Sequence, residues 1–181
     1  MQASGHSGYS GGAASFRILI VGESGAGKTR LTHKILLALS SIASGRVITV
    51  VDMAPDYMGV GRPMPPVPGA RVLRASLHAP RLMSRGDCDK AWRLARENAS
   101  VTTSMLQEYL ESPTPVLSIN DLSIHLHAGD PRLLVEAIEA STVFVGNSYM
   151  GERLRDECGL WEREARGLEE LGRVVDLVWR L

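Results

Sequence analysis

Residues 16–31 read FRILIVGESGAGKTRL, and this stretch decides how the rest of the chain is interpreted. The apolar run at 16–21 ends at a glycine, as expected of a strand buried in a parallel sheet. Beyond the glycines, Leu31, Ile35, Leu39 and Ile42 recur at helical spacing. The stretch therefore predicts a strand, a glycine-rich loop and an amphipathic helix that runs to about residue 43.

The loop at 22–29, GESGAGKT, fits the pattern G-x-x-x-x-G-K-[ST]. Its glycines let successive backbone N–H groups point at phosphate oxygens, and the N-terminus of the helix favours the same anion. Lys28 would reach the β- and γ-phosphates of a nucleotide, and the Thr29 hydroxyl would bind Mg²⁺. In this context the chain resembles the P-loop NTPase superfamily, with the specific motif confined to 22–29. We predict nucleotide contacts from Gly22, Glu23, Ser24, Gly25, Ala26, Gly27, Lys28, Thr29, Arg30 and Asn147.

The remainder of the chain alternates between strand patterns and helix patterns. Strands are predicted at 47–52, 71–77, 115–121, 142–146 and 173–181, and helices at about 87–110, from Asp130-Pro131 onward, and at 149–172. Such alternation predicts an α/β fold in three layers, a mostly parallel sheet with helices on both faces, which is the P-loop NTPase fold. We expect one domain over 16–181, preceded by a disordered Gly/Ser-rich tail at 1–15.

Composition removes several classes of protein. The 181 residues carry a formal net charge of zero, so the chain lacks the basic surplus typical of a nucleic-acid binder. No apolar run approaches the roughly 20 residues that span a bilayer, and the N-terminus lacks the pattern of a signal peptide. We therefore expect a cytoplasmic protein without a membrane segment. Cys88 and Cys158 stand far apart without neighbouring ligands, and both are expected to be reduced.

Two aspartates follow predicted strands at the edge of the sheet where ligands bind. Asp121 ends the apolar run VLSIND and resembles the acidic residue of a Walker B segment. The usual pair there is Asp-Glu, whereas this chain has Asn120-Asp121. Whether Asp121 binds magnesium through water or acts as a base is left open.

Asp52 ends the other such strand. The segment GRVITVVDMAPD resembles the second strand of the partitioning and division-site ATPases, in which an Asp at this place contacts magnesium or the attacking water. Those proteins carry an extra lysine where Glu23 stands here, which argues against their dimerising mechanism. We thus predict Lys28, Asp52 and Asp121 as catalytic residues. The predicted metal ligands are Thr29, Asp52 and Asp121.

The segment between Met53 and Gly86 is rich in arginine and proline. Residues 54–70 hold five prolines and predict an irregular lid or substrate loop. Asp56 is the only acid in the segment, against Arg62, Arg71, Arg74, Arg81 and Arg85. Two interpretations stay open. The arginines could hold an anionic acceptor, or they could pair with the acids of the C-terminal region, Glu152, Asp156, Glu157, Glu162, Glu164, Glu169 and Glu170.

His125 and His127 have i, i+2 spacing and would share one face of an extended segment. No third metal ligand is apparent, so ordinary polar histidines near the substrate are the favoured interpretation. The surrounding INDLSIHLHAGD also resembles the region after Walker B in P-loop corrinoid adenosyltransferases.

The function predicted from these features is ATP binding with Mg²⁺-dependent hydrolysis. ATP is favoured over GTP because no N-K-x-D motif is present. One alternative is a small phosphotransferase, or another ATP-using transferase, with an anionic acceptor held by residues 53–86. Another is a regulatory module that binds nucleotide without turning it over. A protein partner and a homodimer are both left open.

Overall fold

The computed structural model describes residues 15–42 and 47–181. The predicted tail at 1–15, apart from Ser15, lies outside the described residues, and so does the end of the first helix beyond Ile42. The elements follow one another as β1 (Phe16–Gly22), α1 (Lys28–Ile42), β2 (Ile48–Asp52), β3 (Arg71–Arg74), α2 (Pro80–Ser84), α3 (Cys88–Glu111), β4 (Val116–Asn120), α4 (Ser123–Leu126), α5 (Pro131–Glu139), β5 (Val143–Tyr149), α6 (Leu160–Leu171) and β6 (Leu177–Arg180).

All six strands form one sheet in the order β3-β2-β4-β5-β1-β6. Every neighbouring pair is parallel, so the carboxyl ends of the strands lie at one edge of the sheet. β5 lies between β1, which leads into the glycine-rich loop, and β4, which ends at Asn120. The predicted parallel α/β sheet is confirmed.

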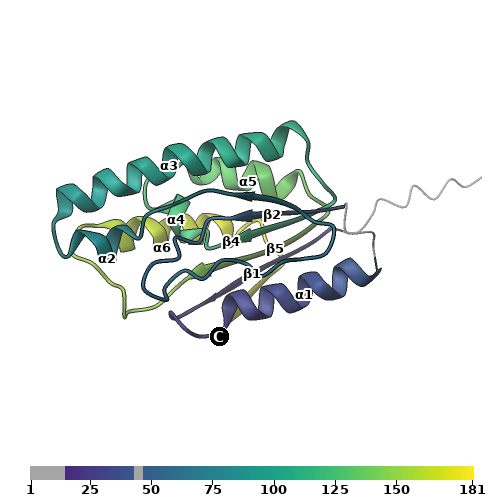
Figure 1. Cartoon of the computed structure of the whole chain (residues 1–181), viewed down its shortest axis with the longest axis horizontal. Coiled ribbons are helices and arrows are strands. Elements are labelled where there is room, and N and C mark those ends of the chain that lie inside the picture. Colours follow the sequence, from purple (N-terminus) through teal and green to yellow (C-terminus); the bar gives the residue numbers. More distant parts are fainter. Residues whose placement is uncertain (1–14, 43–46) are drawn as a thin grey trace, which may run out of the picture.

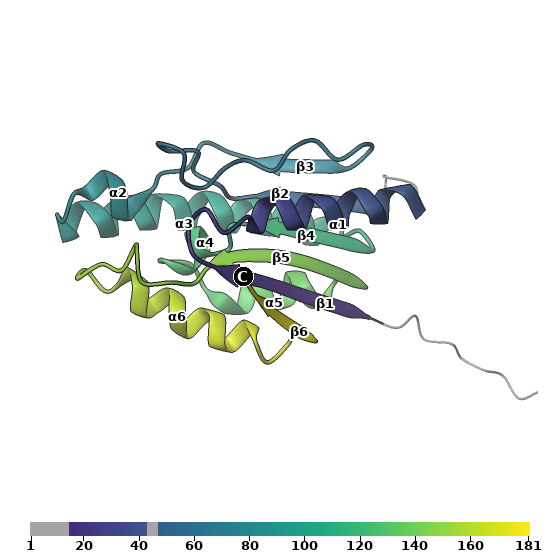
Figure 2. The same cartoon turned by 90° about the horizontal axis from the view of Figure 1, so that it is seen from below.

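Helices cover both faces of this sheet (Figures 1 and 2). The alternation of side chains along β1 shows why. Ile18 and Ile20 face α1 and pack with Leu31 and Ile35. Leu19, in contrast, belongs to the large core formed with α3, α5 and α6 on the opposite face. The three-layer arrangement therefore follows from strands that are apolar on both sides.

The Pro-rich segment at 54–70 contributes to the same core. It contains no helix or named strand, only an isolated bridge between Tyr57 and Val60. Met64 and Val67 are buried, and they pack with Val50 of β2. The segment is thus irregular, as predicted, and part of it is anchored over the sheet.

The region after β5 differs from its prediction. Residues 149–172 were expected to be helical throughout, but β5 extends to Tyr149 and α6 begins only at Leu160. The carboxylate of Asp156 accepts hydrogen bonds from the backbone N–H groups of Leu160 (3.1 Å) and Trp161 (2.9 Å). Asp156 therefore satisfies the free N–H groups that begin α6 rather than lying within a helix. Two short helices, α2 and α4, were not predicted.

A disulfide joins Cys88 to Cys158, with 5.1 Å between their Cα atoms. It links the first residue of α3 to the irregular segment at 150–159. The prediction of two reduced cysteines is wrong, because residues 70 apart in sequence are brought together only by the tertiary fold. Among the described residues, no helix combines the length and apolar character that crossing a membrane requires.

Candidate functional site

The loop between β1 and α1 has the conformation that its glycines predict. Gly25 and Gly27 have φ angles of 80° and 92°, in the region that side chains disfavour. The Ala26 N–H donates to the Glu23 carbonyl at 3.2 Å, and the Leu31 N–H donates to the Gly27 carbonyl at 2.9 Å, which carries the turn into α1. The loop therefore ends at a helix N-terminus, the arrangement that favours a bound anion.

Lys28 folds back over this loop. Its Nζ donates to the carbonyl oxygens of Gly22 at 2.8 Å and Glu23 at 2.7 Å. Burial lowers the pKa of Lys28, and the negative charges of Asp121 and Glu23 oppose that shift. The ammonium group is thus partly buried at one side of the pocket described below.

Glu23 connects the loop to the segment that follows β5. Its Oε1 accepts the Glu152 N–H at 2.7 Å, and this bond lowers the pKa of Glu23. A side chain at Gly151 would meet the Glu23 carboxylate, since a Cβ there would lie 2.2 Å from its Cδ. Most of the loop residues that were predicted to contact nucleotide line the pocket. The exceptions are Gly22, Glu23 and Ala26. We interpret Glu23 as an anchor of the loop.

Polar side chains from three elements meet behind Thr29. Its Oγ1 donates to the Asn120 Oδ1 at 3.2 Å, and the Asn147 Nδ2 donates to the same oxygen at 2.9 Å. The Asn147 Oδ1 in turn accepts the backbone N–H of Asp121 at 3.1 Å. Asn147 is on the pocket lining, as predicted, but its side chain is committed to orienting the ends of β4 and α1.

Asp52 does not line the pocket. It is fully buried and forms an ion pair with Arg74. Its oxygens also accept the Asn120 Nδ2 at 2.7 Å and the Met64 N–H at 2.8 Å. The geometry therefore does not support the prediction that Asp52 binds metal or acts in catalysis. It holds the end of β2 to β3 and to the Pro-rich segment.

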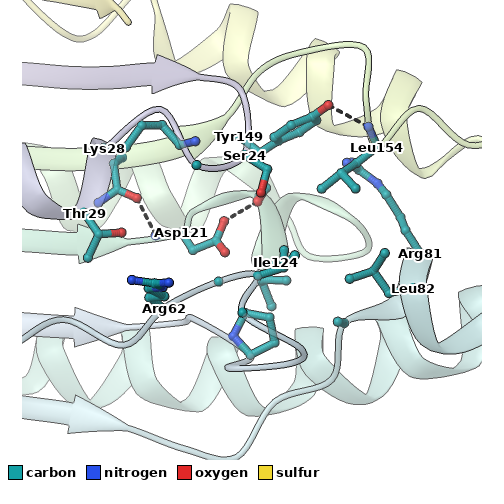
Figure 3. Close-up of a pocket in the computed structure, with 18 of the residues that line it drawn as sticks. Ser24, Lys28, Thr29, Arg62, Arg81, Leu82, Asp121, Ile124, Tyr149 and Leu154 are labelled. Carbon is teal, nitrogen blue, oxygen red and sulfur yellow. Dashed lines mark hydrogen bonds between the residues drawn. The ribbon is translucent and has the colours of Figure 1, made fainter.

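Asp121, in contrast, faces the pocket (Figure 3). Its φ of 63° turns the chain sharply after β4, and its carboxylate accepts a hydrogen bond from the Ser123 hydroxyl. Burial raises the pKa of Asp121, whereas the Ser123 bond and the charge of Lys28 oppose this. A carboxyl group with a raised pKa is a better proton acceptor than an ordinary aspartate.

The loop, α2, α4 and the segment at 59–62 surround a pocket of about 470 Å³. Lys28 and Thr29 lie on one side of Asp121, and Ile124, Leu82 and Arg81 lie on the other (Figure 3). We refer to the first as the phosphate side. The second, the far end, is lined by Ala79, Pro80, Arg81, Leu82, Ile124, His127 and Leu154.

The arginines of residues 53–86 follow the two predicted roles only in part, since Arg71 and Arg74 pair with acids outside the C-terminal region. Arg62 and Arg81 line the pocket. Arg71 pairs with Glu108 on the surface at 2.9 Å, and Arg74 pairs with Asp52. Arg85 ends α2 in a left-handed conformation.

Arg81 is both a pocket residue and a partner of the C-terminal acids. It pairs with Asp156, at 3.3 Å from its Nε, and with the buried Glu164 of α6. Its guanidinium also lies over the Tyr149 ring, 5.4 Å from the centroid. The pairing interpretation is therefore the one that the geometry of Arg81 favours.

The two histidines do not share a face, because the chain is helical there and not extended. His125 packs against α3, with the Thr102 Oγ1 2.8 Å from its Nδ1 and the Asp130 carbonyl 3.1 Å from its Nε2. His127 points to the pocket. In the described part of the chain, no three His, Cys, Asp or Glu side chains are grouped as a metal site would require.

Sequence reasoning missed the contributions of Tyr149 and Leu154. The Tyr149 hydroxyl accepts the Leu154 N–H at 2.8 Å (Figure 3), and Leu154 lines the pocket. The apolar pattern predicts a strand only as far as Gly146, because Asn147 and Ser148 are polar, although both are buried. A pattern based on polarity alone could not detect a strand that continues through buried polar residues.

Comparison with known proteins adds little to this picture. No family model matches the chain, and no curated protein matches it. Among solved structures, the Pif1 helicase from Candida albicans is similar at a TM-score of 0.33 and 12% identity, over 92% of this chain and 36% of the helicase chain. The chain thus spans about a third of that protein. A likeness of this size does not assign the chain to a branch of the P-loop proteins.

Proposed function

We propose that this chain binds ATP with Mg²⁺ at the phosphate side of the pocket and cleaves the terminal phosphoryl group. The observation that carries the proposal is the placement of Lys28 and Thr29 at the start of α1, across the pocket from the Asp121 carboxylate. Backbone N–H groups of 24–29 would bind the phosphates, and Lys28 would turn from the loop carbonyls toward them.

The oxygen donors beside Thr29 suit a hard divalent cation. The Thr29 hydroxyl would bind Mg²⁺. Asn120 would orient that hydroxyl by accepting its hydrogen bond. Bound Mg²⁺ would neutralise charge that develops on the phosphate oxygens. Asp121 does not share in this contact, so we assign to it the role of base that accepts a proton from the attacking group. Its raised pKa fits that role.

Two alternatives remain distinct from hydrolysis. One is transfer of the phosphoryl group to a second molecule, for which the far end of the pocket, beyond Asp121, offers room. The other is a module that binds nucleotide without turnover, which the absence of the usual Walker B Asp-Glu pair at Asn120-Asp121 leaves open. ATP is proposed over GTP because no guanine motif is present in the sequence.

The proposal is tested by thermal unfolding with ATP or GTP, each with and without Mg²⁺, followed by phosphate release. Nucleotide at a hundred times its Kd stabilises a protein by about 2.7 kcal/mol, which for a chain of this size raises Tm by roughly 5–10 °C. We expect Lys28→Ala to abolish this shift. Lys34→Ala removes an exposed lysine from the same helix and should leave it intact.

The absence of any Tm shift with either nucleotide and Mg²⁺ would refute nucleotide binding. A shift without phosphate release would favour the module that does not hydrolyse. Release that begins only when a second compound is added would favour a transferase.

A further inference from the structure

The far end of the pocket differs in character from the phosphate side. Its walls are largely apolar, with Ala79, Pro80 and Leu82 from the start of α2, Ile124 from α4, and Leu154 from the segment after β5. These side chains have no evident use in binding phosphate. Pockets with an apolar lining and a few polar groups are typical of sites for small organic molecules.

His127 is the polar group of this wall whose bonding is incomplete. It is 3% exposed, and neither ring nitrogen has a hydrogen-bond partner among the described residues. The Glu164 Oε2 lies 3.8 Å from the His127 Nε2, too far for a hydrogen bond. His125, two residues earlier, has partners for both nitrogens. A buried polar group without partners is unfavourable unless something else satisfies it.

The charges around His127 indicate what could satisfy it. Arg81 is already paired with Asp156 and Glu164, so its positive charge is compensated. Neither of these acids lines the pocket, whereas Arg81 does, so the two carboxylates are not available to a cation at the far end. An anion would gain little from an arginine that already holds two carboxylates.

The imidazole itself is neutral. Burial and the charge of Arg81 place the pKa of His127 well below its usual value. A neutral imidazole has one N–H donor and one acceptor nitrogen. A hydroxyl or a carboxamide can complement such a ring without bringing a charge into the pocket.

We propose that the far end binds an uncharged small molecule with an apolar body and a hydroxyl or amide group that hydrogen-bonds to His127. This inference rests on the proposed function in one respect, since it makes that molecule the neighbour of the nucleotide. At the far end it takes the place of the anionic acceptor that the arginines of 53–86 left open, because Arg81 is paired and neither Arg71 nor Arg74 lines the pocket. Arg62 also lines the pocket, but it lies on the phosphate side, beside Thr29 (Figure 3).

The test compares three probes with the same ring and different charge: benzamide, benzoate and benzylamine. Each is titrated into the full chain, without nucleotide, and binding is followed by saturation-transfer NMR. The protein carries ¹⁵N-labelled histidine, so that a probe in contact with an imidazole shifts that ring's nitrogen signals. The chain has five histidines, and their imidazole signals are therefore few enough to assign. We expect benzamide to bind in preference to both charged probes and to shift the His127 nitrogens.

Variants separate this site from others. His127→Leu should weaken benzamide binding at least tenfold, and Leu82→Trp, which fills the far end and keeps the imidazole, should do the same. His78→Leu removes a surface histidine that pairs with Glu97 and serves as the control with unchanged binding. The wild-type imidazole shifts answer the question even if His127→Leu does not fold.

Tighter binding of benzoate or benzylamine would overturn the proposal. So would benzamide binding that ignores both pocket variants, or no probe binding at all, which would leave a bound water as the partner of His127. Nucleotide binding is measured separately with Lys28→Ala. If ATP fails to bind while benzamide binds at His127, the proposed function falls and the far-end site remains.

Discussion

The disulfide between Cys88 and Cys158 gives the most quantitative prediction for the stability of this fold. The bond closes a loop across 70 residues and ties the start of α3 to the segment that carries Leu154 and Asp156. In the chain-entropy model, closing a loop of about 70 residues stabilises the folded state by about 4 kcal/mol at 25 °C. Reduction, or the double variant Cys88→Ser/Cys158→Ser, should remove this contribution.

For a chain of this size, a loss of about 4 kcal/mol corresponds to a decrease in Tm of roughly 8–16 °C. The assay is urea unfolding of the oxidised protein with and without dithiothreitol, checked by counting free thiols before and after reduction. The serine variant is the control, because dithiothreitol should not change its midpoint. The midpoint should fall with reduction only in the wild type.

Two results would refute this reasoning. Free thiols in the unreduced, folded protein would show that the bond does not form. A change of less than about 1 kcal/mol on complete reduction would show that the unfolded chain is already held compact without the bond, so that closing the loop removes little entropy.

Further substitutions test the site in detail. Asp121→Asn should abolish phosphate release, and at neutral pH it should match or exceed the wild type in Tm. Because the pKa of Asp121 is raised in the folded state, the protein loses stability as the pH rises from the usual pKa of an aspartate to the raised pKa. An asparagine at this position does not ionise, so the variant escapes that loss. Wild-type activity should fall as pH decreases through the same range. Arg74→Met leaves Asp52 buried without its cation and should cost about 2 kcal/mol in urea unfolding, a figure reduced because Arg74 is 44% exposed. Arg71→Met, on the same strand, is the control and should cost under about 1 kcal/mol. Asn120→Asp should lower Tm at neutral pH, because two ionised carboxylates would then face each other. The variant should regain stability as the pH is lowered and one of the two carboxylates is protonated.

Much of the fold could be predicted from the sequence because its strands are apolar on both faces. VITVVD and PVLSIND are each mainly apolar, with a single Thr or Ser inside the run, and each ends in a polar residue, which is a pattern typical of buried parallel strands. The helix from Asp130-Pro131 was equally clear, and Asp130 does accept the Arg132 N–H at 3.0 Å. Such local signals set the elements but not the order of strands in the sheet.

The elements that were missed depend on contacts distant in sequence. Residues 150–159 resemble a helix in charge pattern, but Asp156 is used to begin α6 and Cys158 is bonded to α3. Within the site, Asp52 and Asp121 look alike in sequence, since each follows a buried strand. Only the position of Arg74, 22 residues after Asp52, distinguishes the aspartate that is neutralised from the one that faces the pocket.

The same contact explains why this chain has Asn120-Asp121 and not Asp-Glu. The Asn120 Nδ2 is 2.7 Å from the Asp52 Oδ1, and the Asn120 Oδ1 accepts the Thr29 hydroxyl. A residue between a buried carboxylate and a hydroxyl donor must donate on one side and accept on the other, and asparagine does both without charge. A carboxylate at 120 would face the Asp52 charge at hydrogen-bond distance. With Asp52 built into the core beside Arg74, the negative charge of the site is left to Asp121. The departure from the usual motif therefore follows from the packing of β2 against β4, and it does not by itself argue against turnover of the nucleotide.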